Sequence, residues 1–378
     1  MQKNQDKLKI MTLFGTRPEI IRLSRVFTKL DQYLSHIMVH TGQSYDYELN
    51  QVFFKELKIR KPDYFLEVKS SSLGQQIAKI ISRSEKVFKK EKPDALLVLG
   101  DTNSSLGAII AKRIKIPIFH MEAGNRCFDE KTPEEINRKI IDHIADINLP
   151  YSENARLYLM REGIHPGTIY VTGSPMAEVL SYYKSQINRS QILKKLKIQK
   201  QKYFLVSLHR EENVDSKKSL TILINTLNAL AQQYSLPIIM STHPRIRQRL
   251  NHYKFKTNKL INFHKPFGYF DYNNLQKNAL CVLSDSGTIL EESSILEFSA
   301  IQVRTNSERP EGFDQGVLIL SGLNQNIILQ ATDITIKQAQ AREKFNIPKD
   351  YQDTNVSSKV LRLILGLTKI IQARRNLI

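Results

Sequence analysis

Short apolar runs that alternate with helical segments constrain this chain more than any other feature of its sequence. The first run is followed by a predicted helix at residues 20–30, with Pro18 in its first turn, where proline costs no backbone hydrogen bond. Continuous apolar runs between helices are typical of strands that are buried in a parallel sheet. Strands are predicted at residues 8–14, 36–40, 95–99 and 118–121.

The same pattern begins again after a Lys- and Gln-rich stretch that ends near Lys202. The chain has 378 residues, enough for two domains of roughly 150 residues each. We therefore predict an α/β fold of two doubly wound, Rossmann-like domains, residues 1–173 and 174–361, that face a central cleft. A C-terminal helix at about 362–378 is expected to pack back on the first domain. The strands predicted in the second domain are 203–207, 237–241, 260–263, 280–284 and 301–303.

The cysteine count and the hydropathy pattern help to predict the cellular compartment of the protein. Only Cys127 and Cys281 occur, so the sequence predicts neither a disulfide framework nor a cysteine-based zinc site. No apolar run approaches the roughly 18 residues of a membrane span, and the polar start of the chain is unlike a signal peptide. A cytoplasmic protein without membrane insertion is expected.

The net charge of +19 raises the question of nucleic-acid binding. The basic residues are scattered, however, and form no zinc-finger or RNA-recognition signature. The densest group, residues 194–202, is typical of a solvated helix and linker. We expect the positive field to steer small anionic substrates, and no nucleic-acid partner is predicted.

Polar residues stand at the predicted strand ends, where open parallel sheets bind their ligands. Neither G-x-G-x-x-G nor a Walker A sequence is present, so NAD and ATP lose their usual sequence support. The residues at or just past strand ends are Arg17, Asp101, Glu122, His209, Asp285 and Ser286.

A helix is predicted to begin after Thr132. Thr132 and Glu135 have the spacing of a capping box, which gives Glu135 a structural explanation. Glu134 has no such explanation, and Arg138 lies one turn later on its face, so the two form either a solvent-exposed pair or part of a site. The apolar stripe of this helix is predicted at Ile136, Ile140 and Ile144.

Residues 285–288 follow a predicted strand and open a helix that contains Glu291 and Glu292. Small residues at a helix start let backbone N–H groups meet a phosphate, although Asp and Ser also cap many helices. His209 and His243 follow neighbouring strands, where a histidine can stabilise phosphate charge, transfer protons or serve only the structure.

Seven motifs in a fixed order carry a resemblance. Together they resemble the non-hydrolysing UDP-N-acetylglucosamine 2-epimerase family, over residues 10–323. The motifs are residues 14–19 (FGTRPE), 100–102 (GDT), 120–124 (HMEAG), 133–138 (PEEINR), 209–211 (HRE), 285–287 (DSG) and 308–311 (ERPE).

The resemblance implies a glycosyltransferase-B-like fold, a homodimer and no metal or redox cofactor. It also implies inversion of carbon 2 in a UDP-N-acetylhexosamine, by elimination of UDP to a 2-acetamido-glycal and re-addition with protonation on the other face. Such chemistry needs cations around the departing pyrophosphate and carboxylates that trade protons.

Site residues are carried over from the resemblance position by position. Asp101, Glu122 and Glu134 would be the acid–base carboxylates, with Arg138 orienting Glu134. Arg17, His209 and Arg309 would neutralise the leaving UDP, His209 being also a catalytic candidate. The remaining substrate-binding candidates are Ser286, Gly287 and Thr288 for the phosphates, Glu292 for the ribose, and Arg22, Phe267 and Tyr272.

Four positions depart from the family pattern. Arg22 replaces a common lysine, Phe267 replaces a polar residue near the uracil, and residues 43–48 lack the usual effector-region sequence. Residues 124–128 replace the usual Gly-Leu-Arg-Thr stretch and introduce Cys127 and Phe128. These variants resemble the branch that makes UDP-N-acetyl-L-fucosamine for capsule or O-antigen. Cys127 and Phe128 add a physical reason, because the apolar surface that they introduce suits a 6-methyl sugar. In the alternative, Phe128 packs under the helix that begins at Thr132.

Four other functions remain open at this point. They are a UDP-N-acetylglucosamine 2-epimerase that forms UDP-N-acetylmannosamine, a glycosyltransferase of the same fold, a hydrolysing epimerase and a non-catalytic binding protein. Free UDP measured against epimer formation separates them.

Overall fold

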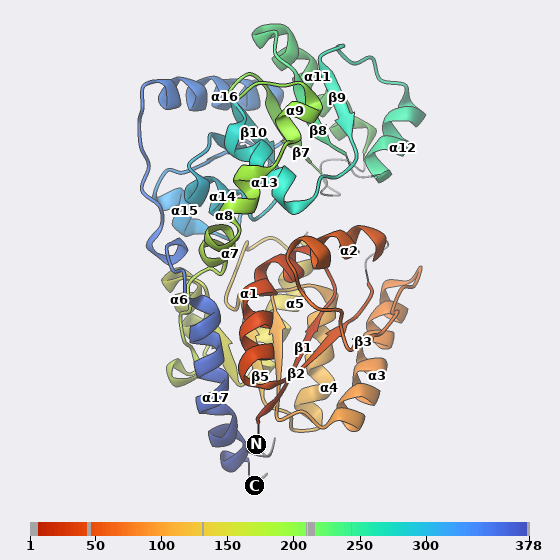
Figure 1. Ribbon diagram of the computed structural model, residues 1–378, viewed down its shortest axis with the longest axis vertical. Helices are drawn as coiled ribbons and strands as arrows, with labels where there is room; N and C mark the ends of the chain where they lie inside the picture. Colours follow the sequence, from red (N-terminus) through yellow and green to blue (C-terminus); the bar gives the residue numbers. More distant parts are fainter. Residues whose placement is uncertain are drawn as a thin grey trace. The chain divides into compact units, whose positions relative to one another are not determined.

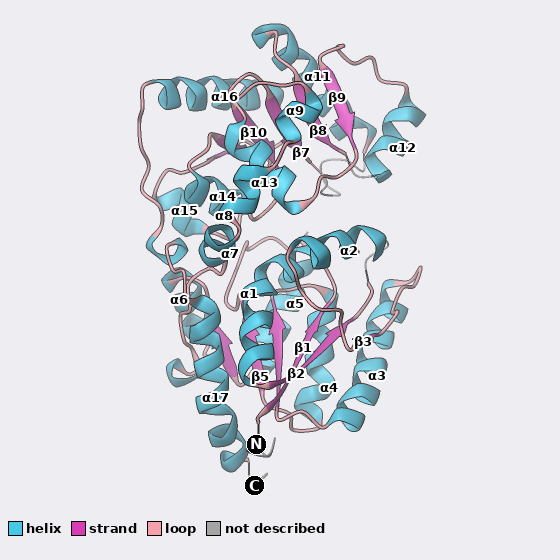
Figure 2. Ribbon diagram, in the orientation of Figure 1, coloured by secondary structure: helices cyan, strands magenta, loops and turns pink. Residues whose placement is uncertain are grey.

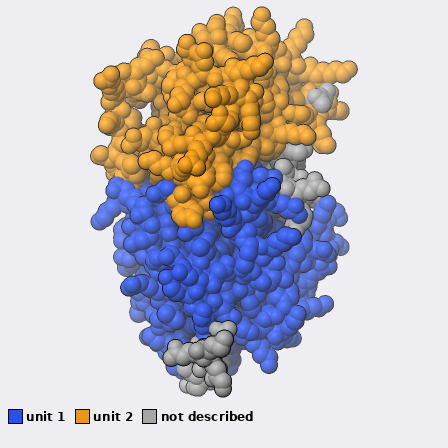
Figure 3. Space-filling model, in the orientation of Figure 1, with its two compact units in different colours: residues 1–181, 349–378 blue, residues 182–348 orange. Residues whose placement is uncertain are grey.

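The computed structural model describes residues 7–43, 47–130, 132–208, 210, 216–242 and 244–375. It divides into two compact units, shown in blue and orange in Figure 3. Unit 1 comprises Met1–Ser181 and Lys349–Ile378, and unit 2 comprises Tyr182–Pro348.

Unit 1 is built on a six-stranded parallel sheet with the strand order β3-β2-β1-β4-β5-β6. Figures 1 and 2 show the sheet with helices packed around it. The strands are β1 (Lys9–Phe14), β2 (Ser35–His40), β3 (Tyr64–Phe65), β4 (Ala95–Leu99), β5 (Ile118–Met121) and β6 (Ile147–Leu149). The helices are α1 (Arg17–Tyr33), α2 (Tyr47–Glu56), α3 (Leu73–Glu91), α4 (Ala108–Arg113), α5 (Pro133–Ile144), α6 (Glu153–Arg161), α7 (Met176–Tyr182) and α17 (Val356–Arg374).

Unit 2 repeats this arrangement with the order β12-β11-β10-β7-β8-β9, again all parallel. The strands are β7 (Phe204–Ser207), β8 (Ile238–Ser241), β9 (Ile261–His264), β10 (Cys281–Ser284), β11 (Ala300–Gln302) and β12 (Ile319–Leu320). The helices are α8 (Lys184–Arg189), α9 (Ile192–Leu196), α11 (Lys217–Tyr234), α12 (Pro244–Tyr253), α13 (Tyr269–Asn278), α14 (Ile289–Leu296), α15 (Pro310–Asp314) and α16 (Gln325–Gln340).

The strand orders locate where each unit is expected to bind a ligand. In unit 1 the order reverses between β1 and β4, and in unit 2 it reverses between β7 and β10. Open α/β sheets bind ligands beyond the strand ends at such a reversal. The loops there contain residues 15–17 and 100–101 in unit 1, and Arg210 and residues 285–287 in unit 2. The predicted fold of two Rossmann-like domains is confirmed.

The chain returns to unit 1 near its C-terminus. Helix α17 begins at Val356 and packs against α1, whereas the sequence predicts a helix from about 362. The Glu178 carboxylate on α7 accepts the Ser357 backbone N–H at 2.8 Å, which ties α7 to this helix. Unit 1 therefore extends to Ser181, beyond the predicted boundary at 173. Among the described helices, none is long and apolar enough to cross a membrane.

Candidate active site

The Glu19 side chain fixes the first loop of unit 1, residues 15–17, through hydrogen bonds. One Glu19 carboxylate oxygen accepts the backbone N–H groups of Gly15 at 3.1 Å and Thr16 at 2.8 Å, and the Thr16 hydroxyl at 2.7 Å. Burial raises the pKa of Glu19 to about 7, although these hydrogen bonds act in the opposite direction. Arg17 is exposed at the start of α1, with its guanidinium 5.6 Å from the Phe53 ring centroid.

Glu122 follows β5 in a strained backbone conformation. Its φ of +63° lies in the left-handed region, which a non-glycine residue adopts only at an energetic cost. The buried carboxylate forms an ion pair with Arg22 and accepts the Asn125 side-chain amide at 3.2 Å. A Cβ at Gly100 would lie 3.1 Å from Glu122 Oε2, so glycine at that position leaves room for the carboxylate.

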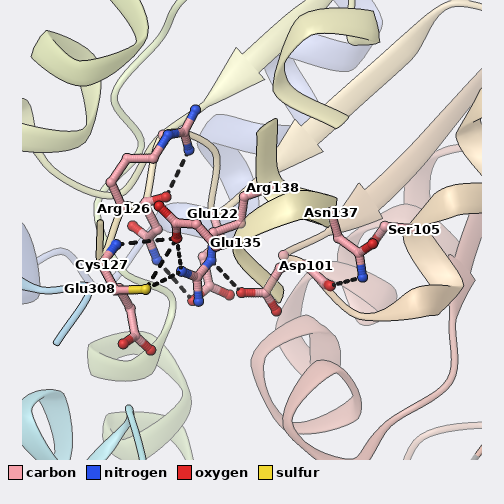
Figure 4. A network of polar contacts seen from close by, with 12 residues as sticks. Asp101, Ser105, Glu122, Arg126, Cys127, Glu135, Asn137, Arg138 and Glu308 are labelled. Carbon is pink, nitrogen blue, oxygen red and sulfur yellow. Dashed lines mark hydrogen bonds and ion pairs between the residues drawn. The ribbon is translucent and has the colours of Figure 1, made fainter. Parts of the chain in front are cut away.

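Asp101 follows β4 and is joined to helix α5 (Figure 4). Arg138 donates from Nε to Asp101 Oδ2 at 2.6 Å. The Asn137 side-chain amide donates to the Asp101 backbone carbonyl at 2.9 Å. Both the carboxylate and the backbone of Asp101 are therefore fixed by consecutive residues of α5.

Glu135 differs from its predicted role. The Thr132 side chain makes no capping hydrogen bond, so the predicted capping box is wrong. Glu135 instead accepts hydrogen bonds from the Cys127 backbone N–H and thiol, both at 3.2 Å, and from the Phe128 N–H at 3.3 Å. A charged donor, Arg138 Nη1, lies 2.6 Å from Glu135 Oε2. The loop that follows Glu122 therefore supplies three of the hydrogen bonds to the Glu135 carboxylate.

The predicted pairing of Arg138 with Glu134 is wrong as well. Arg138 reaches Asp101 and Glu135, because Arg138 and Glu135 lie on the buried side of α5 and Asp101 faces that side from the end of β4. Glu134 is half-buried in the first turn, and no hydrogen bond or ion pair joins it to another residue in the described ranges. The predicted stripe is also rotated, since Ile136 is 57% exposed and Ile140 36% exposed, whereas Ile141 is buried.

A second buried carboxylate, Asp142, supports the same loop from beneath. It lies 2.9 Å from His120 Nδ1 and 2.7 Å from Arg126 Nη1, and it accepts the Gly124 N–H at 3.2 Å. Burial would raise the pKa of Asp142, but His120 and the Arg126 charge hold it below its usual value. Sequence reasoning missed this residue, because a single acid on a helix carries no local signal.

In unit 2, the loop between β10 and α14 closely approaches the segment 308–309. A Cβ at Gly287 would lie 2.5 Å from Glu308 Oε1 and 3.2 Å from Arg309 Nη1, so any other residue at this position would displace these two side chains. The Ser286 and Thr288 hydroxyls lie 2.9 Å apart. The loop therefore combines small residues with the start of a helix, as an anion site requires.

Arg309 is buried between two carboxylates. Its Nε donates to Glu291 Oε2 at 3.1 Å and its Nη1 to Glu308 Oε1 at 3.2 Å. Arg304 Nη1 donates to the other Glu308 oxygen at 2.8 Å. Much of the Arg309 charge is therefore balanced within unit 2.

The remaining candidates in unit 2 lie on three elements. Glu292, on α14, accepts the Gln276 side-chain amide at 2.6 Å and is buried. Phe267 is half-buried, 5.5 Å from the His264 ring, and Tyr272 is half-buried on α13. Asp285 accepts the Arg210 backbone N–H at 2.9 Å. His209, His243 and residues 44–46 of the effector-like region lie outside the described residues.

Comparison with known proteins identifies relatives across almost the whole chain. Residues 28–365 match a family model described as UDP-N-acetylglucosamine 2-epimerase. A structure of UDP-N-acetylglucosamine 2-epimerase from Rickettsia bellii is 46% identical, with a TM-score of 0.89, and the match covers 97% of this chain and 98% of that one.

Two further relatives differ in their named substrates. The UDP-N-acetylglucosamine 2-epimerase of Methanocaldococcus jannaschii is 38% identical over 88% of this chain and 93% of its own length. A crystal structure from that organism, in complex with UDP-GlcNAc and UDP, has a TM-score of 0.88 and 35% identity, covering 95% of this chain and all of that one. A UDP-2,3-diacetamido-2,3-dideoxy-D-glucuronate 2-epimerase from Pseudomonas aeruginosa is 32% identical over 86% of this chain and 91% of its own length.

These matches place the chain among the enzymes that isomerise UDP-sugars. More particularly, it belongs to the UDP-N-acetylglucosamine 2-epimerase family, as the motif resemblance implies.

Proposed function

We propose that the protein inverts carbon 2 of a UDP-N-acetylhexosamine by eliminating UDP and adding it back. The observation that carries this proposal is the group of acids on neighbouring elements of unit 1. Asp101 follows β4, Glu122 follows β5 and Glu134 opens α5, while Arg22 and Arg138 each pair with one of the first two. Such a group supplies both a proton acceptor and a proton donor.

The proposed reaction is balanced without an external electron acceptor. A carboxylate takes the proton from carbon 2, the carbon 1–oxygen bond breaks, and its electron pair leaves with UDP. The resulting 2-acetamido-glycal is protonated at carbon 2 on the opposite face as UDP returns to carbon 1. No redox cofactor or metal is required by this sequence of steps.

Unit 2 would hold the nucleotide. Backbone N–H groups of residues 286–288 at the start of α14 would take the phosphates, and Glu292 would take the ribose hydroxyls. Phe267 and Tyr272 would lie toward the base. Arg17, His209 and Arg309 would balance the charge of the departing pyrophosphate.

The proposed sugar is UDP-2-acetamido-2,6-dideoxy-L-talose, converted to UDP-N-acetyl-L-fucosamine for a surface polysaccharide. Phe128 supports this assignment, since it is 71% exposed on the loop that follows Glu122 and presents apolar surface. Its ring packs edge-on against Tyr158 of α6, at 5.3 Å between centroids, and it is not buried under α5 as the alternative prediction required. A 6-methyl group favours such apolar contact.

UDP-N-acetylglucosamine is the second candidate, and Cys127 favours it. The Cys127 thiol is directed to Glu135 and is buried, so it does not add the apolar surface expected from the sequence. The relatives from Rickettsia bellii and Methanocaldococcus jannaschii are also named for this sugar.

Incubation of one enzyme preparation with each UDP-sugar in heavy water tests the proposal. We expect epimer to form from the L-talose compound, with solvent deuterium at carbon 2, because the original proton is lost. Turnover of UDP-N-acetylglucosamine alone would transfer the assignment to the second candidate. Free UDP without epimer would indicate a hydrolysing enzyme, and retained protium at carbon 2 would exclude the elimination route.

A homodimer is proposed from the family resemblance. Ile136 and Ile140 on α5, together with Leu157 and Met160 on α6, expose apolar side chains that a second copy would cover. Light scattering of Ile136→Asp is expected to show a monomer. Leu365→Asp, on the equally exposed position of α17, is the control and is expected to remain dimeric.

A further inference from the structure

The Arg138 guanidinium is held at two edges by carboxylates from different parts of unit 1. Its Nε donates to Asp101 and its Nη1 to Glu135, each at 2.6 Å. The side chains of Arg138 and Glu135 are 4% and 2% exposed, whereas that of Asp101 is 23% exposed. A planar guanidinium that is bound through two edges cannot rotate freely, so its position fixes the Asp101 carboxylate.

Glu135 is in turn held by the loop that follows Glu122. This carboxylate accepts two backbone N–H groups and one thiol from Cys127 and Phe128 (Figure 4). Burial would raise the pKa of Glu135, but the Cys127 hydrogen bonds and the Arg138 charge lower it below its ordinary value. Glu135 is therefore ionised and links the Glu122 loop to Asp101.

A role confined to capping does not explain these contacts. A capping carboxylate needs only N–H groups at its own helix start. Glu135 reaches a separate loop on one side and a buried arginine on the other. The buried Glu135 carboxylate therefore holds Arg138, which in turn fixes the Asp101 carboxylate.

We propose that Glu135 is a positioning residue for the epimerisation, acting through Arg138 on the orientation of the Asp101 carboxylate. This inference rests on the proposed function, in which Asp101 is one of the carboxylates that trade a proton. Glu135 acts through Arg138 and not on the substrate. Its loss is therefore expected to reduce turnover and to leave substrate binding in place.

Glu135→Gln tests this directly, because glutamine keeps the shape and removes the charge. We expect kcat to fall about 10- to 100-fold, while KM and UDP affinity change less than about threefold. Glu162→Gln is the matched control. Glu162 pairs with Arg126 at 2.6–2.7 Å and not with Arg138, so kcat is expected to stay within about twofold. A rise in KM of more than about threefold, or an unchanged kcat, would overturn the proposal.

A double-mutant cycle separates positioning through Asp101 from an independent effect. If Glu135 acts through Asp101, the Asp101→Asn/Glu135→Gln double variant should be no slower than Asp101→Asn alone, within about threefold. Multiplied losses in the double variant would contradict the proposal.

Two substitutions of Cys127 test the contact between Glu135 and the loop that follows Glu122. Cys127→Ser keeps a donor to Glu135 and should retain turnover, whereas Cys127→Ala should reduce kcat about two- to tenfold by removing one hydrogen bond. Equal kcat values for the two variants would show that the thiol contact does not contribute.

Failure of the proposed function would be recognised separately. Wild-type protein that converts neither UDP-sugar would defeat the function and the catalytic part of the proposal, but not its structural part, that Glu135 fixes the Asp101 carboxylate through Arg138. A crystal structure of Glu135→Ala then decides: loss of the contact between Arg138 and Asp101 supports the claim, and a contact kept at its original length overturns it.

Discussion

A buried guanidinium lies between two carboxylates in each unit, Arg138 in unit 1 and Arg309 in unit 2, but the two arrangements leave different groups for chemistry. In unit 1, Arg138 lies between Glu135 and Asp101, and Asp101 still reaches solvent. In unit 2, Arg309 lies between Glu291 and Glu308, which are both buried. Unit 1 thus retains a carboxylate that can exchange protons with solvent, whereas both carboxylates beside Arg309 in unit 2 are buried.

The difference suggests separate tasks for the two units. The charge cluster of unit 2 adjoins the loop at Gly287. In this loop the Ser286 and Thr288 N–H groups donate to the Ser284 and Ser286 hydroxyls, groups that a bound phosphate can replace as acceptors. The open cluster of unit 1 contains groups that titrate. Substitutions in unit 1 should therefore act on turnover, and those in unit 2 on stability and nucleotide affinity.

The largest expected effect is on turnover in unit 1. Glu122→Gln and Asp101→Asn should each lower kcat by roughly 10²- to 10⁴-fold, because each removes a group that transfers or stabilises a proton. UDP affinity, measured by calorimetry, should stay close to the wild-type value. Near-normal rates in both variants would show that Asp101 and Glu122 do not take part in the chemistry. The assignment of turnover to unit 1 would then be wrong.

The next effect is on the stability of unit 2. Arg309→Ala removes a buried positive charge that pairs with both Glu291 and Glu308, which should cost about 3–5 kcal/mol of unfolding free energy. Arg138→Ala should cost less, because Asp101 can be hydrated and Glu135 keeps its hydrogen bonds from Cys127 and Phe128. Urea unfolding followed by circular dichroism measures both, and a larger loss for Arg138→Ala would reverse the assignment of the more buried charge cluster to unit 2.

The sequence predicted the fold and the positions of the candidate site residues at strand ends, but not which side chains pair with one another. Strand patterning and the strand-end rule depend on local composition, and they located Asp101, Glu122 and residues 285–287. Spacing along α5 allows Arg138 to pair with Glu134 or with Glu135. The choice of Glu135 depends on how α5 is rotated against the loop at Cys127, a tertiary contact that the sequence of one helix does not encode. The same rotation explains the exposed Ile136. Asp142 and Glu19 remained hidden because their partners come from other segments or from backbone groups.

A pH-dependent effect should arise beneath the Gly15 loop of unit 1. Burial raises the pKa of Glu19 from 4.5 to about 7 in the folded chain. The folded state therefore holds this proton more tightly than the unfolded state, so the contribution is complete below pH 4.5 and is lost as the pH rises toward 7. The loss should be on the order of 3 kcal/mol, and Glu19→Gln should not show it.

The measurement for Glu19 is unfolding of wild type and Glu19→Gln at pH 5 and pH 8. The variant should gain stability relative to wild type as the pH rises. A constant difference between the two proteins would mean that Glu19 does not change its protonation between these pH values in the folded chain.

The smallest expected effects concern the nucleotide loop of unit 2, where backbone geometry should matter more than any side chain. Gly287→Ala forces a Cβ against Glu308 Oε1, so either the loop or the Glu308 and Arg309 side chains must shift, and UDP affinity should fall about tenfold. Ser286→Ala keeps every backbone N–H and should lower affinity only about two- to threefold, the value of one modest hydrogen bond. UDP titration by calorimetry gives both numbers, and kcat at saturating substrate should change little in either variant. If Ser286→Ala proved the more damaging of the two, side-chain hydroxyls and not the helix start would hold the phosphates, and the binding task assigned to unit 2 would rest on a different set of atoms.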